Sequence, residues 1–413
     1  MAVKVADNKI NVRNGFGRGQ QDFGRGDQDF DRDGRGGSGS DRRRAIIAAA
    51  AVLIIIAVVV LLMRRFASYG TYTVSWQKDL SQGSLAGYEP FGDGFLKYSK
   101  DGVTCLNGRG TETWVDTYEM KSPVISVNGS FAVIADSQGN EVRIYGSEGK
   151  VGQTTTQLPL LKAAVSRTGI TAVIEEDASS SYIYFLNKDG SSLDVSIRSI
   201  LSGDGYPTSL ALSPDGTRLM VGFEYLSGGV MRGRVVFYDF SEIGKNIPNR
   251  LVGGFDEPFG ESLIADVQYL DGTYSFSAST KGLCFFSSRN LTSPELVKQV
   301  DETDEIRSLF YNDSYVGVIM NNSTGEGRYR LELYKPDGTK VMEKIFDDSY
   351  LNASVDGDYV FVFSSNSGMI LNTAGVEKFR GALDFQVLEM RQGTVPGEFL
   401  MAGPTNLKGV RLR

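Results

Sequence analysis

The stretch TSLALSPDGTRLMVGFEY, residues 208–225, decides the fold. An alternating run reaches the turn PDG and returns as a second apolar run, and Asp-Gly is a favoured hairpin turn because glycine tolerates positive φ. Further along, GRVVFYDF (233–240) provides a third β run and RLVGG (250–254) a fourth strand. The period-two alternation predicts four short antiparallel strands in a unit of roughly forty residues.

The same unit recurs through the chain. It is clearest in SPVISVNGSFAVIADSQGNEVRIYG (122–146), and its first half returns in residues 163–176, 308–321 and 353–365. No amphipathic helical stretch follows Met63. Four strands repeated at this period predict an all-β fold, a β-propeller with four-stranded blades.

The spacing of the repeats predicts eight blades, with a seven-bladed ring as the alternative. Seven blades begin near Leu85, Pro123, Leu160, Pro207, Leu263, Ile306 and Ser349. The eighth is divided between the chain ends, with strands at 385–390, 397–403 and 408–413 completed by TYTVSWQKD (71–79). Trp76 in that last strand has a counterpart in Trp114 of the first blade. Pairing the two ends removes the exposed edges of an open ring.

Composition excludes several classes of function. The chain has no histidine, which removes Ser-His-Asp and Cys-His catalysis and imidazole-based metal sites. Cys105 and Cys284 fall in third strands of blades on opposite sides of the ring, so we expect both to be buried and unpaired. The chain after residue 65 is acidic, which argues against nucleic acid as a partner. We predict no catalytic residues, no cofactor and no metal site.

A second stretch predicts the cellular context. Residues 45–63, AIIAAAAVLIIIAVVVLLM, lack any charge and are bounded by arginines on both sides. As a helix they would extend roughly 28 Å, enough for a transmembrane signal anchor. More basic residues precede than follow it, which predicts a cytoplasmic N-terminus and an extracytoplasmic propeller over residues 66–413. The Gly/Arg/Asp-rich residues 1–44 have the composition of a disordered tail.

Several motifs carry a resemblance. LALSPDGTRLMVGF (210–223) resembles the repeats of WD40-like propellers of the Tol-system type. The whole chain resembles an uncharacterised, domain-of-unknown-function family of single-pass membrane-anchored WD40-like propellers from Gram-positive anaerobic bacteria. The residues that carry it include GDGFLKYSKDGV (92–103), YEMKSPVISV (118–127) and RSLFYNDSYVGVIM (307–320). The resemblance implies architecture and location, and no activity.

The sequence offers one candidate binding face. Loops that join an outer strand to the next inner strand open on the same face of a propeller, and three of them are acidic. The candidate residues are Asp256, Glu257, Asp301, Glu302, Asp304, Glu305, Asp347 and Asp348. A solvated rim that keeps the domain soluble is the favoured interpretation, and the alternative is a surface that binds a basic protein segment or a divalent ion, because clustered charge of one sign focuses the field. The glycine-rich segments 108–113 and 227–235 are expected to be loops without a phosphate site, because no helix follows them.

These observations favour a membrane-tethered, non-catalytic scaffold that binds an envelope protein or a cell-wall polysaccharide at the propeller face. Two alternatives stay open. One is a transmembrane sensor that signals through the N-terminal tail. The other is a glycan hydrolase or lyase that uses a pair of carboxylates in the central pocket.

Overall fold

Among the described residues, one long helix precedes the strands. The computed structural model describes residues 38–81 and 83–413, and in it α1 runs over Ser38–Phe66. The predicted disordered tail, residues 1–44, lies outside the described residues as far as residue 37. Over the described part of the chain, no helix is both long enough and apolar enough to cross a membrane, so the predicted span over residues 45–63 is not supported.

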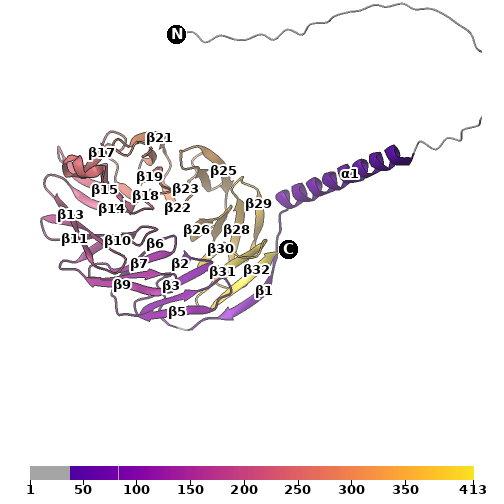
Figure 1. Ribbon diagram of the computed structural model, residues 1–413, viewed down its shortest axis with the longest axis horizontal. Coiled ribbons are helices and arrows are strands. Elements are labelled where there is room, and N and C mark those ends of the chain that lie inside the picture. The colour runs from indigo at the N-terminus through magenta and orange to yellow at the C-terminus, as the bar shows by residue number, and fades with distance from the viewer. Residues whose placement is uncertain (1–37, 82) are drawn as a thin grey trace, which may run out of the picture. The chain divides into compact units, whose positions relative to one another are not determined.

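The compact unit from Arg64 to Arg413 is a β-propeller. Within residues 38–81 and 83–413, strands form eight separate four-stranded antiparallel sheets, arranged as blades around one axis (Figure 1). The prediction of eight blades is confirmed, and the seven-bladed alternative is wrong. From the inner strand outward, the first four blades are β2 (Gly87–Phe91), β3 (Gly94–Tyr98), β4 (Gly102–Leu106), β5 (Glu112–Thr117); β6 (Pro123–Asn128), β7 (Phe131–Asp136), β8 (Glu141–Gly146), β9 (Gly149–Thr155); β10 (Leu160–Val165), β11 (Thr171–Glu176), β12 (Ser180–Leu186), β13 (Ser192–Ile200); and β14 (Tyr206–Leu212), β15 (Arg218–Ser227), β16 (Val230–Asp239), β17 (Leu251–Phe255).

The remaining blades follow the same order, and the last is assembled from both ends of the propeller. Two short 3₁₀ turns, η1 (Gly244–Asn246) and η2 (Pro248–Arg250), interrupt the connection from β16 to β17. Blades five to eight are β18 (Ile264–Tyr269), β19 (Tyr274–Ser279), β20 (Gly282–Ser287), β21 (Glu295–Asp301); β22 (Ile306–Tyr311), β23 (Val316–Asn321), β24 (Tyr329–Tyr334), β25 (Lys340–Phe346); β26 (Asn352–Asp356), β27 (Tyr359–Phe363), β28 (Ser367–Asn372), β29 (Glu377–Ala382); and β30 (Glu389–Gln392), β31 (Glu398–Ala402), β32 (Asn406–Leu412), β1 (Tyr72–Asp79).

The pairing of β1 with β32 closes the ring, as predicted. The two strands run antiparallel from Tyr72 opposite Leu412 to Asp79 opposite Asn406. A register shift beside Trp76 lets its indole lie over Gly409, where a Cβ would come within 2.2 Å of the ring nitrogen. The indole N–H donates a hydrogen bond to Glu398 Oε1 at 3.2 Å. A residue without a side chain is therefore required opposite Trp76.

One predicted strand of the closing blade is misplaced. The sequence predicted the inner strand at 385–390, whereas β30 covers Glu389–Gln392. The apolar residues before it, Val387 and Leu388, lie in the loop that leads into β30. Val387 is buried between blades seven and eight, and Leu388 packs between blades eight and one. Their apolar character reflects burial at the blade junctions rather than strand pairing.

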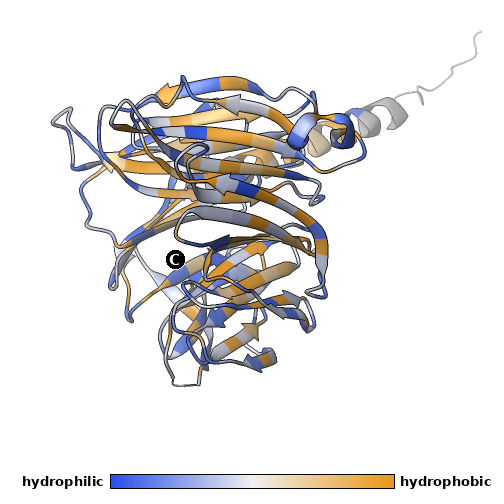
Figure 2. Cartoon of the chain, turned by 90° about the vertical axis from the view of Figure 1, so that its left-hand side faces the viewer, coloured by the Kyte–Doolittle hydropathy of each residue, from blue (hydrophilic) through white to orange (hydrophobic). Residues whose placement is uncertain are grey.

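The core is divided among the junctions between blades. Each of eight clusters of buried apolar side chains combines residues from two neighbouring blades. Middle strands such as β7 and β23 are buried on both faces, while the outer strand β1 is exposed apart from the partly buried Tyr72 and Trp76. In Figure 2 the strands accordingly carry most of the hydrophobic colour. Each blade thus depends on both neighbours for its stability.

The two cysteines fit this arrangement. Cys105 lies in β4 and Cys284 in β20, the third strands of blades one and five. Both are buried and neither forms a disulfide. Burial raises the pKa of the Cys284 thiol to about 12, so this side chain behaves as a small hydrophobe. The predicted buried, unpaired state of both residues is confirmed.

The chain is fastened to blade seven before it enters blade eight. Tyr69 forms a parallel bridge with Phe379 of β29, and its backbone N–H donates to the Lys378 carbonyl at 2.9 Å. The Tyr69 carbonyl in turn accepts from the Arg380 backbone N–H at 3.2 Å. Backbone hydrogen bonds therefore hold the segment that precedes β1 against β29, the outer strand of blade seven.

Ring closure can be tested at Gly409. The Gly409→Ala variant places a methyl group against the Trp76 indole, and we expect it to lower the free energy of unfolding by about 1–3 kcal/mol, as overpacking does. Urea denaturation followed by fluorescence measures this loss. The matched control is Gly254→Ala in β17, where a Cβ meets no atom within 4 Å; it should change stability by less than about 1 kcal/mol. Equal effects of the two substitutions would show that Trp76 does not fix the closure.

Candidate binding face

The direction of the strands sorts the loops onto two faces. Neighbouring strands are antiparallel, so the loops between second and third strands open on the same side as those that join one blade to the next. We call this side the upper face. Among its loops are residues 177–179, 201–205, 228–229, 256–263, 302–305 and 347–351. The chain enters β1 on the opposite, lower face, where the Thr71 hydroxyl donates to the Arg413 carbonyl.

The predicted acidic residues lie along the upper face, but most of them are engaged in ion pairs. Asp256 pairs with Arg234 of β16 at 2.5 Å, and Asp301 lies 3.6 Å from Lys281. Glu305 lies 3.6 Å from Arg307, and Asp347 accepts the Arg328 backbone N–H at 3.0 Å. Of the eight, Glu257 alone has no ion pair or side-chain hydrogen bond within the described residues. Most carboxylates of the predicted face are therefore neutralised by a neighbouring basic side chain.

Arg330 of β24 joins two of these acids and Glu332 of its own strand into one cluster. Its guanidinium lies 2.8 Å from Glu302, 3.2 Å from Asp304 and 3.1 Å from Glu332. Burial and the neighbouring Glu332 raise the pKa of Glu302, while Arg330 opposes that rise. The side chains are largely buried, so the cluster holds loop 302–305 against blade six and leaves little of its charge for a ligand.

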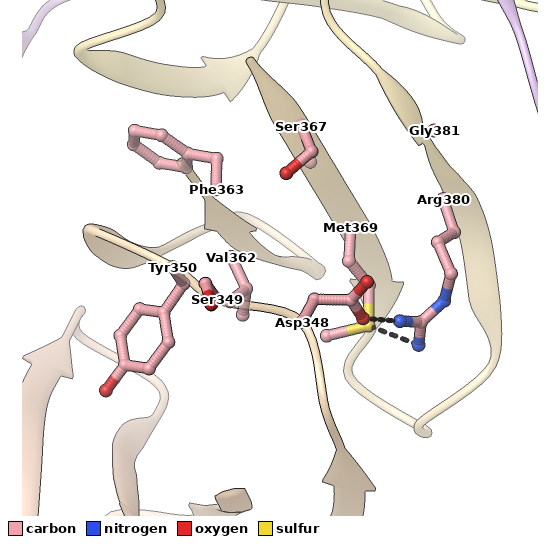
Figure 3. A pocket seen from close by; sticks show the side chains of 10 residues that line it. Asp348, Ser349, Tyr350, Val362, Phe363, Ser367, Met369, Arg380 and Gly381 are labelled. Atoms are coloured by element: carbon pink, nitrogen blue, oxygen red, sulfur yellow. Dashed lines mark hydrogen bonds and ion pairs between the residues drawn. The ribbon is translucent and has the colours of Figure 1, made fainter. Parts of the chain in front are cut away.

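A similar contact occupies the loop before blade seven. Arg380 of β29 pairs with Asp348 and also donates to Met369 Sδ at 3.0 Å (Figure 3). The small pocket around these residues and Tyr350 has a volume of about 100 Å³. That volume holds a few water molecules and falls well short of an organic ligand site.

An apolar opening on the upper face lies between blades three and four. It has a volume of about 760 Å³ and is bounded by loop 201–205 and by the hairpin of β15 and β16. That hairpin is long, with ten residue pairs from Arg218↔Asp239 to Ser227↔Val230. Gly228 and Gly229 both have positive φ and form its two-residue turn. We call this opening the apolar pocket.

Exposed aliphatic side chains line the apolar pocket. Leu201 is 51% exposed and Leu226 is 67% exposed, and Ile200 and Met231 are also exposed. Such a cluster at the mouth of a cavity is typical of a protein-interaction site. At its edge the Tyr206 hydroxyl donates to Glu176, and burial raises the pKa of Glu224.

This pocket was not predicted from the sequence. Residues 227–235 were predicted to form a loop, which is wrong, because β16 begins at Val230 and only Gly228 and Gly229 form the turn. The available signal was the pair of apolar residues Val230 and Met231 directly after a two-glycine turn. Polar residues usually occupy the tip of an exposed hairpin, so apolar ones indicate a contact surface.

Inner strands carry carboxylates, the kind of group that the alternative of a glycan hydrolase or lyase requires. Glu89 of β2 and Glu389 of β30 lie on neighbouring inner strands. Burial raises the pKa of each to about 7, and the charge of Glu89 adds to the effect at Glu389. The Ser354 hydroxyl donates to Glu389 at 2.9 Å. Over the described part of the chain, no group of three or more acidic or cysteine side chains is placed to hold a metal ion.

The inner-strand carboxylates predict a pH-dependent stability. Glu389 binds its proton more tightly in the folded chain than in the unfolded chain, so the free energy of unfolding should fall as the pH rises from about 4.5 to about 7. Glu389→Gln removes this group and should lessen the loss between pH 5 and pH 8 by about 1–3 kcal/mol. Urea denaturation at both pH values measures it. Exposed Glu257→Gln is the control and should follow the unsubstituted chain; an unchanged pH dependence in Glu389→Gln would contradict the prediction.

Comparison with known proteins identifies the fold and the family. No curated protein matches the chain. Three solved structures are similar: the Dos1 propeller, at 12% identity and a TM-score of 0.51 over 82% of this chain and 95% of that one; Chaetomium thermophilum Sqt1 bound to the N-terminus of the ribosomal protein L10, at 11% identity and a TM-score of 0.50 over 79% and 92%; and Kuenenia stuttgartiensis hydrazine synthase, at 13% identity and a TM-score of 0.42 over 83% and 99%. The last score is too low to carry an argument, and the first two show the fold alone.

The family model is more specific. The model of a family of unknown function, DUF5711, matches residues 65–412, which is the whole propeller. The predicted resemblance to a domain-of-unknown-function family of propellers is confirmed at that level. Membrane anchoring and a Gram-positive source stay predictions. On this match, the chain belongs to the DUF5711 family of unknown function.

Proposed function

We propose that the propeller is a non-catalytic binding module that holds a protein segment at the apolar pocket. The observation that carries the proposal is the exposure of Ile200, Leu201, Leu226 and Met231 around one cavity of about 760 Å³. Burying such side chains contributes roughly 25 cal/mol for each Å² removed from water. A partner that inserts a large apolar side chain between loop 201–205 and the hairpin would bury them.

The charges around the apolar pocket favour a partner with basic residues beside its apolar anchor. Arg232 and Arg234, the bases of the hairpin, are already paired with Glu261 and Asp256. Glu224 lines the pocket and Asp177 precedes the lining residue Ala178, and neither has an ion pair within the described residues. The local field is therefore negative, and it would attract a basic segment and repel an acidic one.

The similar structure of Sqt1 is relevant to this proposal in one respect. That propeller is bound to the N-terminus of the ribosomal protein L10, so a propeller of this general architecture can hold a protein terminus. At 11% identity the likeness says nothing about which segment binds here. The choice of an apolar and basic segment rests on the pocket itself.

The binding proposal is tested with a double substitution in the pocket. Leu226→Asp with Met231→Asp adds charge at two exposed positions, so the fold should be retained, while affinity for short peptides with an aliphatic or aromatic residue between lysines should fall at least about tenfold. Titration of fluorescent peptides measures this. Leu351→Asp is the matched control, because Leu351 is 76% exposed on the same face outside the pocket. Equal binding by both variants, or a preference for peptides with acidic flanks, would overturn the proposal.

We further propose that residues 45–63 tether the propeller to a membrane and present its upper face to an envelope partner. This part of the proposal rests on the sequence, in which nineteen uncharged residues lie between arginine clusters.

Tethering is tested by fractionation of cells that produce the full chain. We expect the protein to stay in the membrane fraction after alkaline carbonate extraction, and the propeller to be digested by protease added outside intact cells. A chain that lacks residues 45–63 should move to the soluble fraction. Recovery of the full chain in the soluble fraction would contradict tethering, and protection from the external protease would contradict the predicted orientation.

A further inference from the structure

A second cavity lies on the side of the propeller, between blades two and three. It has a volume of about 450 Å³ and is separate from the apolar pocket. One wall comes from β9 and the loop after it, the other from β12, and the floor includes Val173 of β11 and Leu186 of β12. We call it the lateral cavity. Its chemistry differs from that of the apolar pocket, because hydroxyl and aromatic groups replace exposed aliphatic ones.

Two tyrosines form the aromatic wall of the lateral cavity. The rings of Tyr182 and Tyr184 are nearly parallel, with their centroids 6.1 Å apart and an interplanar angle of 18°. The Arg198 guanidinium lies 5.8 Å from the Tyr182 ring centroid and covers part of that ring. Tyr184 has no such cover, and burial and the charge of Glu175 raise the pKa of its hydroxyl. Tyr184 is thus the aromatic group more available to a ligand.

The opposite wall presents polar groups whose hydrogen-bonding capacity is unused. Thr154, Thr155 and Gln157 contribute to this wall, and within the described residues none of them makes a side-chain hydrogen bond. The same holds for the Tyr184 hydroxyl. Hydroxyl and amide groups of this kind can each donate and accept, so they suit a ligand that is itself rich in hydroxyl groups.

A buried carboxylate completes the cavity. Glu175 lines it although the residue is only 6% exposed. Its side chain accepts a single hydrogen bond, from the Leu158 backbone N–H to Oε2 at 3.3 Å, and burial raises its pKa. Within the described residues no group donates to Oε1, which leaves this oxygen free for a donor from a ligand. A ligand hydroxyl or amide N–H that reached Oε1 would supply the missing donor.

From this combination we propose that the lateral cavity is a binding subsite for a neutral or N-acetylated oligosaccharide. A pyranose ring presents polarised C–H groups on its faces, which suit the negative face of an aromatic ring such as Tyr184. Its equatorial hydroxyl groups would bond Thr154, Thr155, Gln157 and Glu175. The lining contains one acid and no base, so polyanionic polymers are disfavoured. The absence of exposed aliphatic side chains from the lining disfavours an apolar peptide.

The test uses the full propeller and defined probes. Binding of cellotetraose and chitotetraose is measured by isothermal titration, with tetralysine as a cationic peptide probe. We expect at least one of the sugars to bind and tetralysine not to bind. Tyr184→Ala and Glu175→Gln should each weaken sugar binding at least about tenfold. Tyr311→Ala is the control, because Tyr311 is an exposed tyrosine on β22, outside the cavity.

The outcomes separate this inference from the proposed function. Tyr184→Phe keeps the aromatic ring and is expected to fold normally, so it should retain most of the affinity for sugar. It serves as a control for misfolding of Tyr184→Ala. Absence of sugar binding, binding of tetralysine alone, or an equal loss in Tyr311→Ala would each overturn the inference. The Leu226→Asp/Met231→Asp variant should bind sugar normally, because the two cavities are distinct, and loss of sugar binding there would also contradict it.

Discussion

The antiparallel pairing of β1 with β32 is the interaction on which the rest of the propeller depends. The core has no single centre, because its apolar clusters lie at eight junctions and each junction needs two blades. An open ring would leave blade eight without its outer strand and would expose the edge of β32. Trp76 takes part in that pairing and also packs beside the cluster between blades eight and one. One strand from the beginning of the propeller therefore stabilises its last blade and the junction that follows it.

Much of this fold could be predicted from the sequence, because the repeats report strand pairing directly. The turn at Pro214–Gly216 and the alternation around it describe a blade, and the two tryptophans, Trp76 and Trp114, both lie in outer strands as expected. The prediction was wrong where burial and strand pairing give the same signal. Phe385, Val387 and Leu388 are apolar because they pack at blade junctions, and local pattern alone cannot distinguish that from an inner strand. Residues 227–235 were mistaken for a loop because two glycines concealed a long hairpin.

The candidate site was only partly predictable. Strand direction was enough to place the acidic loops on one face, since it depends only on the order of strands within a blade. Their ion pairs could not be predicted from the sequence. Arg234 and Asp256 are separated along the chain by the outer strand β17, and Arg330 and Arg380 approach their acids only once the blades have formed. The apolar pocket and the lateral cavity are likewise formed between blades. Each combines residues from two repeats, whereas a sequence pattern describes one repeat at a time.

The fastening of Tyr69 to β29 has a mechanical consequence. A pull on the chain from its N-terminal side would first load the backbone hydrogen bonds of Tyr69 and would then act along β1 from Tyr72 towards Asp79. Because β32 is held from its opposite end at Asn406, the ladder between the two strands would be loaded in shear. All of its hydrogen bonds then resist together, instead of opening one after another as in a peeled hairpin. The strand that closes the ring is thus also placed to carry tension.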